Sequence, residues 1–216
     1  KFARSLAAIE VPRDRNPSEP SGTVDGPFVA AMRDAIRDLD IGKLAAAQAA
    51  AERARDLIPG FAAPNGPYMV LYRIHGASGD SAAAIEALRG QVAHNESDYE
   101  AHLTLAGLLA AKGDAAGAAD ILERAMYIYP YDAGVHTRMA ELYATAGQHR
   151  KAVRERRAVL ALAPVNRADA LYRLALALAD AGDRDNARRE VLRALEIAPN
   201  YPDAQDPLLR LRGGDS

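Results

Sequence analysis

The chain has 216 residues, of which 49% are hydrophobic and 26% are charged, and its net charge is −2. This balance is typical of a soluble globular protein with a sizeable core, and the small net charge gives no overall attraction to nucleic acid or anionic membrane. The sequence contains no cysteine, which excludes disulfides and thiolate metal sites. No apolar run approaches the length of a membrane span.

The first 27 residues differ in composition from the rest of the chain. Residues 2–10 (FARSLAAIE) predict a short amphipathic helix, and residues 11–27, with four prolines and two glycines, have the composition of a linker. Two interpretations stay open: the segment is the tail of a preceding part, or it docks on the following helices as a cap through Phe2, Leu6 and Ile9. Because the chain begins with lysine, we expect a processed product or a piece of a longer protein, and any targeting signal would lie in the missing part.

Two stretches that follow, 28–59 and 65–98, each predict a pair of short helices. In the first, Gly42 is the expected hinge and Pro59 the end, because proline cannot continue a helix interior. In the second, Gly79 and Asp80 are the expected hinge and N-cap. Residues 60–67 would form a loop between the two pairs, and Asp98 is expected to cap the next helix.

Residues 99–132 show the helix pair most clearly. Leucines on its first half and Ile121 and Leu122 on its second half recur at helical spacing, not at the alternation of a strand. Gly113 suits the left-handed position that ends a helix, where a β-carbon would be strained. Asp114 suits the N-cap of the second helix, because its carboxylate can accept from free backbone N–H groups.

This pattern recurs in residues 133–167 and 168–201. The hinge glycines Gly113, Gly147 and Gly182 are 34 and 35 residues apart, and alanines and prolines keep the same steps: Ala118, Ala152 and Ala187, then Pro130, Pro164 and Pro199. A helix–turn–helix repeated about every 34 residues indicates a solenoid array. Residues 203–212, which contain three leucines, predict a final helix that covers the open end.

The repeat resembles the tetratricopeptide repeat family, on small residues at Ala106, Ala140 and Ala175 and at Ala118, Ala152 and Ala187, and on large residues at Leu109, Tyr143 and Leu178. It departs from the family where His102, His136 and Leu171 replace the usual tryptophan, and where Arg156 and Val159 replace an aromatic residue and an alanine. The resemblance implies an all-α fold, a right-handed α-solenoid over 28–216, with pairs at 28–59, 65–98, 99–132, 133–167 and 168–201.

The sequence carries no metal-binding, nucleotide-binding or hydrolase motif, so we expect no enzyme activity and no cofactor. His102 and His136 occupy equivalent places one repeat apart. They would form a shared metal or pH-sensitive site, or they replace the usual large packing residue. We favour packing, because no carboxylate or third histidine stands at ligand spacing.

Charge is uneven along the array. Residues 28–132 hold nine Lys and Arg against fourteen Asp and Glu, a net of −5, whereas residues 133–199 hold twelve against eight, a net of +4. Much of the excess lies on the expected second helices. We favour solvated helix faces over a contact patch for an acidic partner, and nucleic acid is disfavoured because no aromatic residues interleave with these arginines.

The resemblance implies a concave groove lined by the first helices, in which family members bind peptides. The matching residues here are Met69, Arg73, Leu103, Gly107, Thr137, Arg138, Glu141, Tyr172, Arg173 and Leu176, with Met32 and Ile36 extending the surface. The lysines and asparagines of the family's clamp for chaperone C-termini are missing here, so that ligand is not expected. The tyrosines of residues 127–131 are assigned to packing between repeats rather than to the groove rim.

Three functions follow from this interpretation. The first is an interaction scaffold that binds a protein or peptide in the groove, with arginines holding a carboxylate. The second is an accessory repeat domain of a larger enzyme, joined through the proline-rich segment. The third is a self-assembling structural subunit, in which the acidic front of one copy meets the basic back of the next.

Overall fold

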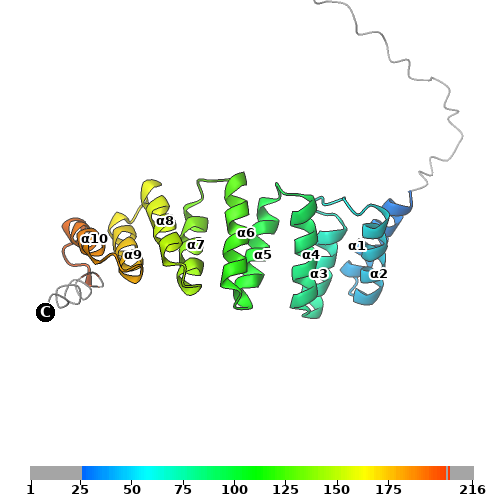
Figure 1. The fold of residues 1–216 in the computed structure, drawn as a ribbon. Coiled ribbons are helices and arrows are strands. Elements are labelled where there is room, and N and C mark those ends of the chain that lie inside the picture. The colour runs from blue at the N-terminus through cyan, green and yellow to red at the C-terminus, as the bar shows by residue number, and fades with distance from the viewer. Residues whose placement is uncertain (1–25, 203, 205–216) are drawn as a thin grey trace, which may run out of the picture.

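The computed structural model describes residues 26–202 and residue 204. Within them the chain is all-α, with ten helices and no strand. The expected N-terminal helix and its docking residues lie outside the described residues, and so does the expected final helix at 203–212, apart from Ala204. Figure 1 shows the helix pairs following one another along the array, with α1 and α2 at one end and α9 and α10 at the other.

The helices form five antiparallel pairs joined by short turns. Each helix packs against the helices before and after it in the chain, so that the array is a helical repeat solenoid whose pairs cover one another. The bounds are α1 (Pro27–Asp40), α2 (Leu44–Leu57), α3 (Pro67–Ser78), α4 (Ser81–His94), α5 (Tyr99–Ala111), α6 (Ala115–Ile128), α7 (Ala133–Thr145), α8 (His149–Ala161), α9 (Arg167–Asp180) and α10 (Arg184–Ile197).

The turn within each pair has the conformation that the sequence predicted. All five hinge glycines have φ between +70° and +82°, the left-handed region in which a side chain is strained. The predicted caps at Asp80, Asp98 and Asp114 are also confirmed, because each carboxylate accepts a hydrogen bond from a backbone N–H of the first turn that follows it. These turns set where one helix ends and the next begins.

The core runs along the array between the two helices of each pair. Alanines at equivalent places on the second helices are at most 2% exposed, which lets neighbouring helices approach closely: Ala47, Ala84, Ala118, Ala152 and Ala187. Larger side chains such as Leu105, Leu122 and Tyr143 fill the space between pairs and are fully buried. Because each pair has apolar residues on both flanks, its burial depends on its neighbours.

First and second helices form two layers. Arg154 of α8 contacts Glu123 of α6, so second helices of successive pairs are neighbours. Arg138 of α7 lies against Gly107 of α5, so first helices are neighbours too. The exposed side of α1, α3, α5, α7 and α9 is called the first-helix surface below.

Candidate functional site

Arg138 of α7 lies on the first-helix surface, next to α5. Its guanidinium rests on α5, where a β-carbon at Gly107 would be 3.2 Å from Nη2, so glycine leaves room for the arginine to lie across the neighbouring helix. Arg138 is exposed, and no acidic side chain among the described residues pairs with it. A guanidinium in this position can donate two parallel hydrogen bonds to an incoming carboxylate.

The residues predicted on α3 and α5 divide into two kinds. Arg73 is exposed and, within residues 26–202, has no ion-pair partner. Met69 and Leu103 are half-buried and pack against the core cluster of the central pairs, so each offers only part of its side chain. The extension to Met32 was wrong: Met32 is 8% exposed and lies in the core between α1 and its neighbours, because its position on α1 turns inward.

On α9 the predicted residues form an aromatic and ionic cluster. The Arg173 guanidinium lies 5.9 Å from the Tyr172 ring centroid, and its Nε donates to Asp169 Oδ1 at 3.3 Å. Tyr201 donates to the same oxygen at 2.7 Å and packs edge-on against Tyr172, with ring centroids 5.4 Å apart. Arg173 therefore already has an acidic partner, which leaves Arg138 and Arg73 as the better anion-binding candidates on this surface.

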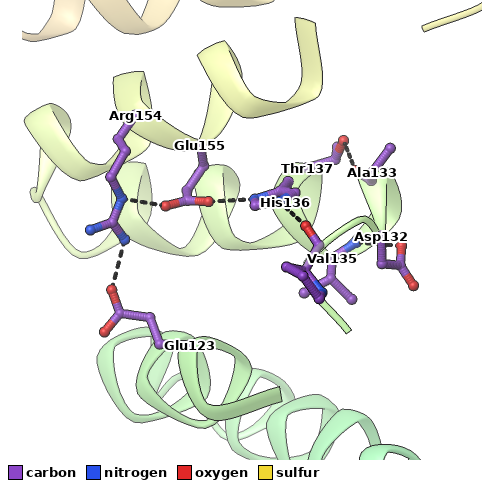
Figure 2. A network of polar contacts seen from close by, with 9 residues as sticks. Glu123, Asp132, Ala133, Val135, His136, Thr137, Arg154 and Glu155 are labelled. Atoms are coloured by element: carbon purple, nitrogen blue, oxygen red, sulfur yellow. Dashed lines mark hydrogen bonds and ion pairs between the residues drawn. The ribbon is translucent and has the colours of Figure 1, made fainter. Parts of the chain in front are cut away.

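Thr137 and Glu141 on α7 differ in the contacts that they already make within the protein. The Thr137 hydroxyl donates to the Ala133 carbonyl at 2.8 Å, inside its own helix (Figure 2), so its oxygen can only accept from a ligand. Glu141 is exposed, and its Oε1 lies 3.4 Å from Nη2 of Arg156. That contact is long for an ion pair, so Glu141 is only weakly held.

A small cavity of about 160 Å³ opens between α7, α8 and α9. It joins the predicted residues Arg173 and Leu176 to three side chains that the sequence prediction missed for the site, namely Arg156, His149 and Asp180. The side chain of Arg156 is 14% exposed. The sequence already showed that Arg156 stands where the family usually carries an aromatic residue. That replacement was the signal that could have pointed to this position.

A charged network crosses the second-helix layer at α6 and α8 (Figure 2). Glu155 is 3% exposed, and its two oxygens accept from Arg154 Nε and from His136 Nδ1, each at 2.6 Å. Arg154 also donates to Glu123 at 2.7 Å, and His136 Nε2 lies 3.1 Å from the Pro130 carbonyl. The chain of contacts links α6, the α6–α7 loop, α7 and α8.

Three side chains in and beside this network, Glu123, Arg154 and Tyr143, have shifted pKa values. The hydrogen bond from Arg154, with help from nearby positive charge, holds the pKa of Glu123 below its ordinary value, and the same bond raises the pKa of Arg154. Burial raises the pKa of Tyr143, whose ring lies beneath Lys151 and Arg154. All the charges of the network are paired within the protein, so its role is to hold successive pairs together.

The two equivalent histidines differ in their partners. His102 is fully buried, as expected of a packing residue, and its Nδ1 lies 2.8 Å from the Asp98 carbonyl. His136 has the Glu155 carboxylate, which sequence spacing did not reveal because it comes from the second helix. Across residues 26–202 and 204 no three His, Asp or Glu side chains gather as metal ligands would.

The tyrosines near the end of α6 were assigned to packing, and only part of that assignment holds. Tyr129 packs edge-on against Tyr99 and Tyr131, with centroid distances of 6.1 and 6.5 Å. Tyr127, in contrast, is 92% exposed. An aromatic ring so completely open to solvent does not pack the junction between repeats.

The arginines of the second helices are partly paired along their own helices. Arg193 contacts Glu190 at 2.8 Å, and Arg189 donates to Asn186. Arg150 and Arg157 line a hollow of about 450 Å³ beside the α9–α10 turn, together with Asp183. These contacts agree with the favoured interpretation of solvated helix faces.

None of the helices between residues 26 and 204 combines the length and apolar composition that crossing a bilayer requires.

Comparison with known proteins gives family matches and structural likenesses. Tetratricopeptide repeat models match residues 71–133 and 168–201, and no curated protein sequence matches the chain. A MamA crystal structure is 22% identical, covers 79% of this chain and 91% of its own, and has a TM-score of 0.54. YrrB, described as a TPR protein with an unusual peptide-binding site, is 18% identical, with 83% and 91% covered and a TM-score of 0.56.

A further likeness is to the structure of Naa15/Naa10 bound to HypK, at 16% identity and a TM-score of 0.55, covering 81% of this chain and 26% of that one. At these identities the structural likenesses show the fold alone.

Proposed function

Because the chain belongs to the tetratricopeptide repeat family, we propose that its first-helix surface binds an extended, acidic segment of a partner protein. The proposed function is that of an interaction scaffold without catalytic activity of its own. The array is stacked before the partner arrives, so binding orders little of the protein itself.

The observation that carries the proposal is the environment of Arg138. Its guanidinium lies across Gly107 on the neighbouring helix and has no acidic partner within the described residues. Arg73 of α3 is a second exposed arginine of the same layer. A segment that runs across α3, α5 and α7 would meet both arginines, and carboxylates would complete their hydrogen bonding. YrrB, with its peptide-binding site, supports the class of function but not these residues.

Selection from a library of random dodecapeptides, with the whole chain immobilised, tests the proposal. We expect enriched peptides to share acidic residues, and we expect Arg138→Glu to weaken their binding roughly tenfold or more, because like charges then meet across the contact. Binding by isothermal titration of one selected peptide gives the number.

The matched control is Arg188→Glu, which makes the same charge change on an exposed arginine of α10 outside the first-helix surface. If Arg188→Glu weakens binding as much as Arg138→Glu, the effect is net charge and the assignment to the first-helix surface is wrong. If the selected peptides carry no acidic residue, the proposed ligand class is wrong. Tyr172 is a poor test position, because its ring packs against Tyr201.

A further inference from the structure

Arg156 of α8 occupies a position that the other four pairs give to the core. Nine residues after each hinge glycine, the second helices of those pairs carry apolar side chains that are 0% exposed: Ala51, Leu88, Leu122 and Val191. Arg156 stands at the same place in the α7–α8 pair, and its side chain is only 14% exposed. A guanidinium held in a core position loses much of its hydration, so it costs stability unless an acidic group pairs with it.

The protein itself supplies only a weak partner for this charge. Nη2 of Arg156 lies 3.4 Å from Oε1 of Glu141, a long contact with a side chain that is itself 64% exposed. Within residues 26–202 no hydrogen bond engages Nε or Nη1 of Arg156, and neither atom is closed off from solvent. Asp180 of α9 forms no ion pair with Arg156 in that range. The guanidinium therefore keeps donors that an incoming acceptor can reach.

Arg156 lines the cavity of about 160 Å³ between α7, α8 and α9. The apolar part of the cavity wall consists of small residues and one leucine: Ala140, Ala144, Ala152, Leu176 and Ala177. The other polar groups on the wall are His149, Arg173 and Asp180. Because Arg173 and Asp180 are exposed residues of α9, the mouth of the cavity lies on the first-helix surface. The cavity is smaller than pockets that hold drug-sized molecules, and its volume suits one short side chain.

We propose that this cavity receives the side chain of a glutamate from the partner protein, with its carboxylate on Arg156. The inference rests on the proposed function, because the glutamate belongs to the acidic segment bound on the first-helix surface. A carboxylate accepts charge-assisted hydrogen bonds from a guanidinium, and the two methylene groups of glutamate match the alanine walls. Asp180 and Glu141 lie beside the site, so a phosphate with two negative charges would be repelled more strongly than a carboxylate with one.

Binding is measured with N-acetyl-glutamate amide, which carries the glutamate side chain on an uncharged backbone. NMR spectra of the ¹⁵N-labelled whole chain follow the Nε–H signal of Arg156 at constant ionic strength, and Arg156→Leu identifies that signal by its loss. We expect the signal to shift with a dissociation constant on the order of 10 mM, as suits so small a probe. N-acetyl-glutamine amide, which has the same shape without the charge, should bind roughly tenfold more weakly.

Arg156→Leu tests the site and its cost together. Leucine fits the same position in the preceding pair, as Leu122 shows, so the variant should unfold at a higher urea concentration while its backbone amide signals no longer respond to the probe. The matched control is Arg157→Leu, which removes the same charge from the next residue. Arg157 is exposed and does not line the cavity, so this variant should bind the probe within about twofold of the unmodified chain.

The outcome is separable from that of the proposed function, because the probe is used without any selected peptide. Arg138→Glu, which is expected to weaken the binding of selected peptides, should leave the affinity for the probe within about twofold. The comparison of the glutamate and glutamine probes uses the unmodified protein, so it does not depend on the folding of any variant.

Each of four binding results would overturn the proposal: equal affinity for the two probes, unchanged probe binding in Arg156→Leu, tighter binding of inorganic phosphate than of the glutamate probe, or binding of propionate without binding of N-acetyl-glutamate amide. The last result would assign the cavity to a free small acid instead of a partner's side chain. A lower urea midpoint for Arg156→Leu would also count against it, because Glu141 would then already satisfy the arginine.

Discussion

Removing Glu155 should destabilise the array more than any other single charge removal in the second-helix layer. Its carboxylate is 3% exposed and accepts from His136 and Arg154 at 2.6 Å each. Glu155→Ala would leave His136, whose side chain is 14% exposed, without its acceptor. Breaking a buried pair from one side costs about 3–5 kcal/mol. Because Arg154 is 56% exposed and keeps Glu123, its share is small, and we expect about 3 kcal/mol.

A double-mutant cycle separates the pair from the loss of packing. Glu155→Met and His136→Leu together remove both polar partners and keep similar volumes, so the double variant should recover most of the stability that either single change loses. The measurement is urea unfolding followed by circular dichroism on the four proteins of the cycle, with a coupling free energy of about 1–3 kcal/mol expected.

The reasoning would be refuted if Glu155→Ala cost less than about 1 kcal/mol, the value typical of exposed ion pairs. Additive effects in the cycle would refute it too, because they would mean that the two side chains do not act on each other. Curves that separate by probe would show unfolding of α6–α8 before the rest, as a repeat array permits.

Three further predictions concern packing, backbone strain and acid stability. Ala187 is fully buried between helices, so Ala187→Phe should overpack that contact and cost about 1–3 kcal/mol in urea unfolding; an unchanged midpoint would contradict the helix register. Ala163 has φ of +53°, in the left-handed region. Ala163→Gly should therefore raise stability by about 0.5–1 kcal/mol, and a loss would show that its side chain packs. The pKa of Glu123 is held below its ordinary value of 4.5 by Arg154. The stability this gives is present above pH 4.5 and lost as pH falls through the lower folded value, so Glu123→Gln should flatten the acid limb of stability against pH, whereas parallel limbs would argue against the bond.

Much of the fold followed from local chemistry in the sequence. Each hinge needs a residue that tolerates positive φ, and glycine at 42, 79, 113, 147 and 182 supplies it. Aspartates such as Asp80, Asp98 and Asp114 show where helices begin, because the carboxylate on a short side chain can accept hydrogen bonds from the free N–H groups of the first turn. The 34-residue step then predicts stacking, because one pair cannot bury both of its apolar flanks.

The exposure and the partners of the candidate site residues were harder to predict from the sequence. The sequence placed Arg138 and Arg173 at equivalent positions of adjacent repeats. In the structure Arg173 donates to Asp169, whereas Arg138 lies against the backbone of Gly107. Met32 matched the repeat register but lies in the core. Register alone fixes which helix a residue belongs to; its exposure depends on how far each pair is rotated against the next.

The histidines show the division between sequence and tertiary structure most sharply. The sequence by itself determined that His102 and His136 occupy one repeat position, since periodicity is a property of the chain. Only the tertiary structure decided that Glu155, from another helix, completes His136, whereas no group in the described residues pairs with Nε2 of His102. Which side chains on two different helices form a hydrogen bond depends on how the helices pack. That packing depends on all the neighbouring side chains together.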